Sequence, residues 1–176
     1  MAVIEKVYKY DSIISYRFGD LRSRQWLKTV MILASKLGDG PGWVIVSLFV
    51  LAFGGEAGRR AVILVVMAFP LCVAVFKIIK SKTSRQRPFE KYPDLVMESA
   101  LPPPDRFSFP SGHSMCAFAI ATIISFYFPV ASIPLCAFAA LIAASRIFLA
   151  LHYPTDCLAG AAVGVMISLA LITALG

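Results

Sequence analysis

The chain of 176 residues is 59% hydrophobic and only 15% charged, it carries a net charge of +7, and its mean hydropathy is +0.77. A soluble domain has a smaller apolar share and a larger charged share, so these values exclude a disordered or collagen-like chain, a disulfide-rich miniprotein and an ordinary soluble globule. They predict one membrane-embedded protein whose basic residues contact anionic headgroups of the lipid bilayer, with no nucleic acid partner.

Residues 1–38 have the pattern of two amphipathic helices that lie in the membrane interface. Apolar residues recur at helical spacing, first at Val3, Ile4, Val7 and Tyr8 and then at Trp26, Val30, Ala34 and Leu37. The alternative is a short transmembrane helix over 25–37. That segment has 13 residues and two lysines, which is too short to cross about 30 Å of hydrocarbon and favours the interfacial interpretation.

Residues 39–176 predict a membrane-embedded domain with about five transmembrane helices, so the expected fold class is an all-α polytopic helix bundle. The apolar runs that supply the spans are 43–53, 61–79, 111–146 (two helices, broken near 129–134) and 154–175. Between the runs lie a glycine-rich turn at 38–42, a loop at 54–60 and a polar, proline-rich segment at 80–110. Gly160 and Gly164 form a GxxxG pattern that allows close approach of another helix.

Three polar junctions fall on the same face of the membrane when these crossings are counted. The first follows the second span, the second precedes the third span, and the third joins the fourth span to the fifth. They carry the segments KSKTSRQRP (80–88), PSGH (110–113) and SRIFLALHYPTD (145–156), which include both histidines of the chain. We therefore expect the three segments to form one site at the membrane boundary.

The cations of this predicted site favour a phosphate group. Lys80, Arg87 and Arg146 converge with no acidic residue at a matching position, and arginine presents a planar fork that suits phosphate oxygens. Ser111 and Gly112 stand at the start of a helix, where free backbone N–H groups attract anions. The alternative role for each cation is an anchor at a helix end, with its charged group extended to the membrane interface. This alternative is weaker for Arg146, because its charge interrupts an apolar run and is costly there.

The two histidines supply candidate groups for phosphoryl transfer. Asp156 follows His152 by four residues, so on a helical turn it can reach one ring nitrogen and leave the other free to attack phosphorus. His113 has no carboxylate at comparable spacing and is the candidate general acid. The alternatives are a capping role for His113 and an interfacial role for His152. Neither a metal nor a cofactor is predicted, because no set of ligands appears at the required spacing.

The three segments resemble the tripartite signature of the type 2 phosphatidic acid phosphatase superfamily of integral membrane lipid phosphatases, which reads KX6RP, PSGH and SRX5HX3D. All three parts are intact and in order, and the resemblance covers residues 38–176. The amphipathic N-terminus fits the smaller bacterial members, whereas larger members often have six spans. Vanadium haloperoxidases share the signature but are soluble, so the apolar spans argue against their activity.

The resemblance implies a metal-independent hydrolysis of a lipid phosphate ester or diphosphate. It implies these roles: His152 as the nucleophile that forms a phosphohistidine, Asp156 as its orienting carboxylate, His113 as the acid, and Lys80, Arg87, Ser111, Gly112 and Arg146 as the phosphate-binding residues. The implied substrate classes are polyprenyl diphosphate, phosphatidic acid, phosphatidylglycerol phosphate and lipid A phosphate. The long segment 89–109 between two catalytic clusters is the expected headgroup selector.

Two further questions stay open at the level of sequence. The resemblance suggests a bacterial inner membrane, and the positive-inside rule places the site in the cytoplasm, whereas many bacterial relatives face outward. If residues 25–37 crossed the membrane, the charge bias would largely disappear. Two rival functions are a lipid phosphotransferase, which uses the same intermediate with an acceptor other than water, and a non-enzymatic lipid-binding or transport protein, which has no need of the histidine pair.

Overall fold

The computed structural model describes residues 2–95 and 105–176, and within these ranges the chain is helical with no strand. The main helices are α1 (Ala2–Asp20), α2 (Gln25–Gly38), α3 (Pro41–Phe53), α4 (Gly55–Thr83), α5 (Pro88–Lys91), α6 (Gly112–Tyr127), α7 (Ser132–Phe148) and α8 (Pro154–Leu175). Short 3-10 turns, η1 (Leu21–Ser23) and η2 (Pro129–Ala131), lead into α2 and α7. The predicted all-α class is confirmed.

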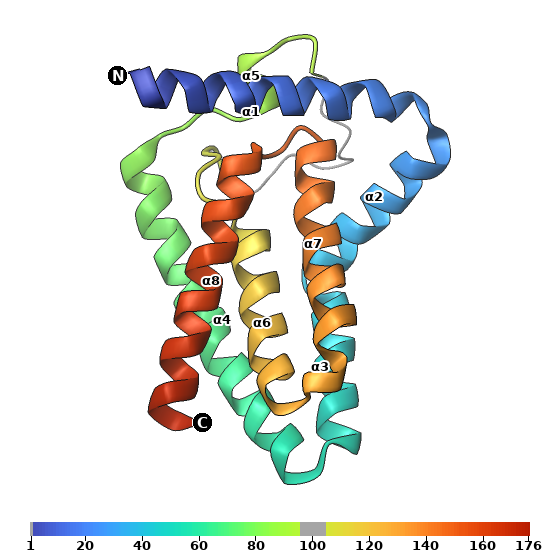
Figure 1. Cartoon of the computed structure of the whole chain (residues 1–176), viewed down its shortest axis with the longest axis vertical. Helices are drawn as coiled ribbons and strands as arrows, with labels where there is room; N and C mark the ends of the chain where they lie inside the picture. Colours follow the sequence, from blue (N-terminus) through green and yellow to red (C-terminus); the bar gives the residue numbers. More distant parts are fainter. Residues whose placement is uncertain (1, 96–104) are drawn as a thin grey trace.

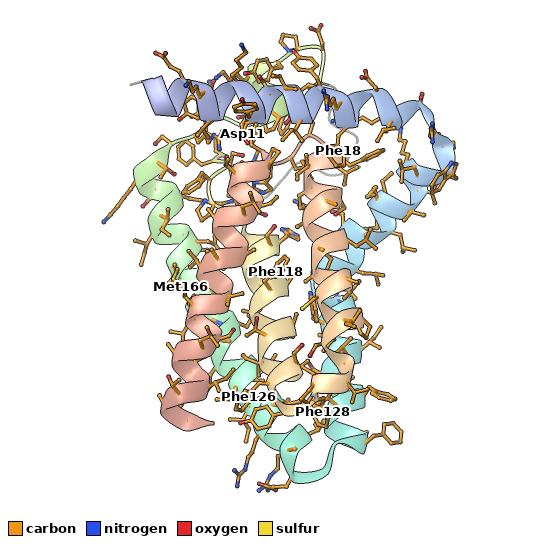
Figure 2. The ribbon with its side chains drawn as sticks, in the orientation of Figure 1. Asp11, Phe18, Phe118, Phe126, Phe128 and Met166 are labelled. Carbon is orange, nitrogen blue, oxygen red and sulfur yellow. The ribbon has the colours of Figure 1, made fainter. Side chains whose placement is uncertain are left out.

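Helix α6 stands at the centre of the bundle and packs against α4, α7 and α8 (Figure 1). Helix α1 lies across one end of the bundle, which we call the α1 end, and the connection between α3 and α4 forms the opposite end. Phe126 and Phe128 lie toward that opposite end, whereas Asp11 and Phe18 lie beneath α1 (Figure 2). The chain enters α6 and α8, and leaves α4 and α7, at the α1 end (Figure 1).

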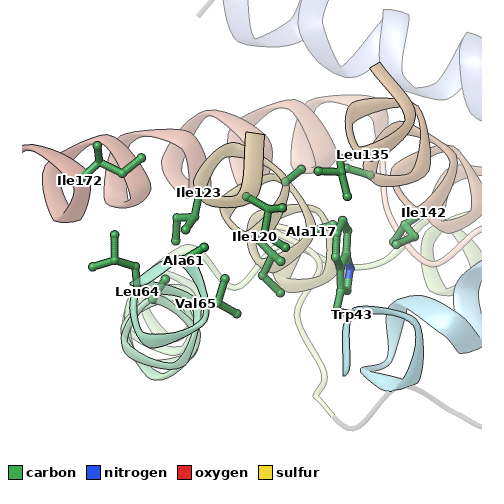
Figure 3. Close-up of a cluster of buried hydrophobic side chains, with 14 residues drawn as sticks. Trp43, Ala61, Leu64, Val65, Ala117, Ile120, Ile123, Leu135, Ile142 and Ile172 are labelled. Atoms are coloured by element: carbon green, nitrogen blue, oxygen red, sulfur yellow. The ribbon is translucent and has the colours of Figure 1, made fainter. Parts of the chain in front are cut away.

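The hydrophobic core fills the space around α6 (Figure 3). Ile120 and Ile123 of α6 belong to one cluster with buried side chains from the surrounding helices, among them Trp43, Ala61, Leu64, Val65, Leu135, Ile142 and Ile172. The outward faces of α3, α4 and α8 keep large apolar side chains exposed, as expected of helices whose surroundings are lipid. The core therefore holds the helices together while their outer surfaces remain suited to a bilayer.

The GxxxG pattern of α8 sets its distance from α6. A Cβ atom built on Gly160 would collide with the carbonyl oxygen of Ser111, and one on Gly164 would collide with that of Met115. The predicted close approach of a second helix is thus confirmed. As a result the start of α8 lies beside the start of α6, where the Ser111 N–H donates to the carbonyl oxygen of Asp156 at 3.0 Å.

Three described helical segments are long and apolar enough to cross a membrane by themselves, namely Gly55–Lys91, Pro129–Phe148 and Pro154–Leu175. Helices α2 and α3 pass the same test together as a pair bent by 59°, and α6 is an apolar helix of 16 residues. By length and composition the described residues thus hold three spans, or four with the bent pair, against the predicted five. The predicted span that fails this test is the third one, α6, which lies along the bundle although it is short (Figure 1).

Two sequence-based boundaries are wrong. Residues 54–60 were expected to form a loop, but α4 begins at Gly55, since Glu56 in its first turn pairs with Arg59 and Arg60 one turn later. Residues 80–83 also belong to α4, so only part of 80–110 is irregular.

The interfacial placement of residues 1–38 stays a prediction. Helix α1 lies across the bundle, as an interfacial helix would, whereas α2 slants from the α1 end toward α3 and packs against α7 (Figure 1). The turn at 39–40 joins α2 to α3, so α2 is the first half of a bent pair.

Candidate active site

The three predicted segments meet at the α1 end of the bundle around a cavity of about 680 Å³. Its polar wall contains most of the predicted site residues, namely Lys80, Arg87, Gly112, His113, Arg146 and His152. Ser111 and Asp156 lie directly behind this wall and are fully buried. The topological expectation of one shared face is therefore met by the fold.

His152 is placed by the turn that ends α7. Beyond Phe148 the chain makes a left-handed turn at Ala150 (φ 58°), and the N–H groups of Leu151 and His152 both donate to the carbonyl oxygen of Arg146, at 3.0 and 3.2 Å. The imidazole is almost completely buried, and its Nε2 atom lies 3.3 Å from Nη1 of Arg87. Burial, and then the cations Arg87 and Arg146, lower the pKa of His152 well below its usual value of 6.5. The ring is therefore neutral, as a nucleophile must be.

Asp156 supports His152 less directly than predicted. Its Oδ2 atom lies 3.7 Å from Nδ1 of His152, beyond hydrogen-bonding distance, so the expected direct hydrogen bond is absent. The hydroxyl of Ser108 donates to that Oδ2 atom and lies 3.5 Å from Nδ1 of His152. The same carboxylate caps α8 by accepting the N–H of Tyr153 at 2.8 Å. Ser108 thus stands between the carboxylate and the imidazole.

A carboxylate does face the cations, which corrects the expectation that none was present. Asp105 Oδ1 accepts from Lys80 Nζ at 2.6 Å and from Nη2 of Arg87 at 2.7 Å. Burial raises the pKa of Asp105, but the hydrogen bonds and charges of Lys80 and Arg87 outweigh burial and lower it overall. Both cations therefore donate to one anionic oxygen, so their geometry suits an oxyanion.

Arg146 also lines the cavity and is 5% exposed. Its Nη1 atom donates to the hydroxyl of Ser35 in α2 at 2.5 Å, while its Nε atom is buried without a hydrogen-bond partner. A buried guanidinium with an unsatisfied donor is costly, and a phosphate in the cavity is a natural partner for it. Arg87 likewise has a buried Nε atom without a partner.

His113 projects from the first turn of α6, where Ser111 is the N-cap and its side chain accepts the N–H of Ser114. Nε2 of His113 forms a hydrogen bond with Oδ1 of Asp39, in the turn between α2 and α3. Sequence spacing suggested no carboxylate partner for His113, and the structure supplies one from far along the chain. Both residues of the pair line the cavity, as does the buried imidazole of His152.

Four side chains of the site were missed by sequence reasoning: Asp39, Arg85, Asp105 and Ser108. Arg85 lies inside the first motif and Ser108 lies just before the second, so both were near a recognisable signal. Asp39 and Asp105 stand in turns with no motif of their own. Within residues 2–95 and 105–176, no group of three or more His, Cys, Asp or Glu side chains could hold a metal ion, and metal independence stays a prediction.

Comparisons with known proteins identify the family of the chain. The PAP2 superfamily model matches residues 58–176. Phosphatidylglycerophosphatase B of Bacillus subtilis (strain 168) is 30% identical over 157 residues, covering 81% of this chain and 72% of the relative. An undecaprenyl-diphosphatase of Sulfolobus acidocaldarius is 28% identical over 144 residues, covering 81% of this chain and 68% of the relative.

Two solved structures have the same fold. The crystal structure of a transmembrane PAP2-type phosphatidylglycerolphosphate phosphatase from Bacillus subtilis superposes with a TM-score of 0.73 at 27% identity, covering 96% of this chain and 85% of that one. The structure of LpxE from Aquifex aeolicus gives a TM-score of 0.69 at 22% identity, covering 90% and 93%. At this lower identity the likeness concerns the fold alone.

The fold and the site together define a polytopic membrane phosphatase. The chain belongs to the PAP2 superfamily. It is an integral membrane enzyme that acts on lipid phosphates.

Proposed function

We propose that this protein hydrolyses the phosphate ester or diphosphate of a membrane lipid through a phosphohistidine on His152, without a metal ion. The observation that carries the proposal is the shape of the cavity. It has a cationic end at Lys80, Arg87 and Arg146 and continues as an apolar groove along α3 and α4. A lipid phosphate has the same two parts.

The apolar groove runs toward the hydrocarbon region of a bilayer. It is lined by side chains of two helices, namely Val44, Leu48 and Leu51 of α3 and Val62, Val66 and Phe69 of α4. Several of them, including Leu48 and Val66, are exposed on the outer surface of the bundle, so the groove is open to lipid. A substrate can therefore keep its tail between α3 and α4 while its phosphate reaches His152.

The residues divide the reaction into two steps. The phosphate oxygens are held by Lys80, Arg87 and Arg146. They also accept from the N–H groups at the start of α6, where Ser111 and Gly112 lie. Nε2 of neutral His152 attacks phosphorus and the ester P–O bond breaks, while His113 gives a proton to the leaving oxygen. Water then attacks the phosphohistidine, with His113 accepting its proton, and inorganic phosphate is released. Asp156, acting with Ser108, orients the imidazole.

The substrate class is tested with a panel of lipid phosphates in detergent, assayed with and without EDTA. We expect phosphate release from at least one of polyprenyl diphosphate, phosphatidic acid, phosphatidylglycerol phosphate and lipid A phosphate. The motifs imply these classes, and two relatives are named phosphatidylglycerophosphatase B and undecaprenyl-diphosphatase. Activity should persist in EDTA, because the cavity has cations where a metal enzyme has ligands. Loss of activity in EDTA with recovery in Mg²⁺ would contradict the metal-independent mechanism, and a phosphorylated acceptor in place of free phosphate would identify a phosphotransferase.

We propose that segment 89–109 selects the headgroup. Residues 96–104 lie outside the described part of the chain, but Asp105, at the end of the segment, contacts the phosphate-binding cations directly. Asp105 thus stands beside the proposed phosphate position, where the headgroup beyond the phosphate must pass. Exchange of 96–104 for the matching segment of a relative with another substrate should change the order of preference in the panel, with the phosphate inhibition constant unchanged.

We propose that the protein lies in a bacterial inner membrane with its active site facing the cytoplasm. Helix α1, which carries Lys6, Lys9 and Arg17, is at the same end as the site (Figure 1). Arg59 and Arg60 lie near the start of α4, at the opposite end (Figure 1). The charge bias thus persists even with α2 and α3 as one crossing. The C-terminus lies away from α1 (Figure 1), so a reporter fused there should be periplasmic, and a cytoplasmic reporter would reverse the orientation.

A further inference from the structure

Asp11 occupies an unusual position for a carboxylate. It lies on the inner face of α1, one turn from Val7 and Ser15, and its residue is only 1% exposed. Figure 2 shows it beneath α1, facing the bundle. A charge on the buried face of an amphipathic helix is costly unless it is paired. The other acidic residue near the end of this helix, Asp20, is exposed.

The partner of Asp11 is a guanidinium that also holds the carboxylate of the active site. Arg85 donates through Nη2 to Oδ2 of Asp11 at 2.6 Å and through Nη1 to Oδ1 of Asp156 at 2.5 Å. The guanidinium also stacks on the ring of Tyr153, 4.1 Å from its centroid. One side chain therefore connects α1 to the carboxylate beside His152.

Asp11 also accepts two hydrogen bonds from the start of α8. Its Oδ1 atom accepts the backbone N–H of Thr155 at 3.1 Å, and its Oδ2 atom accepts the Thr155 hydroxyl at 2.5 Å. Thr155 directly precedes Asp156, and its hydroxyl also lies 2.9 Å from Nη1 of Arg85. The four side chains form a closed network, so a movement of α1 would reach Asp156 through both Arg85 and the backbone.

We propose that Asp11 is a positioning residue for catalysis, so that α1 supports the active site through Arg85 and Asp156 in addition to lying in the membrane interface. This role rests on the proposed attack by His152. Asp11 and Asp156 each bear a negative charge against the single positive charge of Arg85, which leaves the network with a net negative charge. A positive charge develops on the imidazole as it attacks phosphorus, and the negative charge of the network stabilises it. The cations Lys80, Arg87 and Arg146 in the cavity have the opposite effect.

Removal of the Asp11 charge should therefore slow the chemical step without weakening phosphate binding. Lys80, Arg87 and Arg146, which bind the phosphate, have no hydrogen bond or ion pair with Asp11 among the described contacts. Asp11 lies outside residues 58–176, the part of the chain that matches the superfamily model. Its partners Arg85, Thr155 and Asp156 lie within the motif segments, whereas Asp11 itself belongs to none of them.

The test compares Asp11→Asn with Asp20→Asn, a matched change at the exposed end of the same helix, in the full-length protein in detergent. With phosphatidic acid or p-nitrophenyl phosphate as the probe, Asp11→Asn should lower kcat about tenfold, with KM and the inhibition constant of inorganic phosphate within about twofold of wild type. Asp20→Asn should leave all three constants unchanged. Wild-type kcat in a folded Asp11→Asn protein would overturn the proposal.

A double-mutant cycle separates positioning from general stability. Arg85→Lys and Asp11→Asn act on the same contact, so the double variant should be no slower than the slower single variant. Additive losses, or a loss of phosphate affinity that follows a lowered Tm, would show a merely structural role. If Asp11→Asn does not fold, Asp11→Glu replaces it, because it keeps the charge but moves the carboxylate by one methylene. Because the charge is kept, this variant should retain kcat within about threefold of wild type, whereas a tenfold loss of kcat in folded Asp11→Glu protein would contradict the electrostatic role.

Failure of the proposed mechanism is distinguished by labelling wild-type protein with radioactive phosphate from the substrate. Absence of a labelled histidine would remove the nucleophilic role of His152. Because the network would then have no imidazole to orient in that role, it would also overturn the positioning of Asp11 as stated. A labelled histidine in wild type, together with slower labelling in Asp11→Asn, would support both.

Discussion

Asp105 and Lys80 form an ion pair of 2.6 Å at the point where the phosphate of a substrate is proposed to bind. The same carboxylate oxygen accepts from Arg87 at 2.7 Å, so it occupies donors that a phosphate needs. Hydrogen bonds to charged groups are individually worth about 1.5–3 kcal/mol. The carboxylate must therefore be displaced or share these donors when a phosphate enters.

Asp105→Asn should strengthen inhibition by inorganic phosphate, because the amide competes less well than a carboxylate for Lys80 and Arg87. We expect an inhibition constant about tenfold lower, which corresponds to about 1.4 kcal/mol. Asp94→Asn, a change at an exposed position, is the control. An unchanged or weaker inhibition in Asp105→Asn would show that Asp105 holds the cations in place instead of competing with the ligand.

Arg146→Lys should weaken inhibition by phosphate or vanadate by about tenfold or more, because the substitution keeps the charge but removes the planar two-pronged donor. The buried, unpartnered Nε atom of Arg146 strengthens this expectation. Arg59→Lys, at the exposed opposite end of the bundle, provides the control. If Arg146→Lys binds phosphate as tightly as wild type in folded protein, Arg146 is only an anchor that pairs with Ser35.

His113→Ala should lose activity according to the leaving group. General acid catalysis contributes roughly a hundredfold or more, so we expect a loss of that order on an alkyl phosphate and a much smaller loss on p-nitrophenyl phosphate. Asp39→Asn should show the same pattern more weakly, because Asp39 contacts the imidazole. Equal losses of kcat on both substrates would remove His113 from the acid role.

The pH dependence follows from the lowered pKa of His152. Between that pKa and 6.5 the unfolded chain binds more protons than the folded one, so the free energy of unfolding decreases as pH falls below 6.5. The imidazole itself should stay neutral at pH 6.5. In untagged His113→Ala, His152 is the only histidine, and nitrogen NMR can follow its titration without further assignment. A midpoint at or above 6.5 would contradict the electrostatics of the site.

Sequence predicted the parts of this protein that depend on local pattern. The apolar runs indicated α4, α7 and α8, the glycine pair of α8 indicated its contact with α6, and the parity of the crossings brought the three motifs to one end. These features depend on spacing alone, and spacing is visible in a sequence. The residues named by the motifs accordingly line or support one cavity.

The site contacts that the sequence did not predict are made between segments that are far apart in the chain. Asp39 and His113 are 74 residues apart, and Asp105 and Lys80 are 25 apart, so no local period relates them. Ser108 intervenes between His152 and Asp156 because the segment before α6 folds back over the start of α8, which helical spacing does not reveal. The loop expected at 54–60 is wrong for another reason, because this segment interrupts the apolar run while the Glu56 ion pairs support a helix.

The most direct test of the account is the chemical identity of the phosphoenzyme. Wild type and His113→Ala should be quenched during turnover of a radiolabelled lipid phosphate, and the labelled peptide identified. The account predicts an acid-labile, alkali-stable phosphohistidine at His152, and no label and no turnover in a folded His152→Ala protein. Label at another residue, or turnover of His152→Ala within about tenfold of wild type, a difference of only about 1.4 kcal/mol, would contradict it.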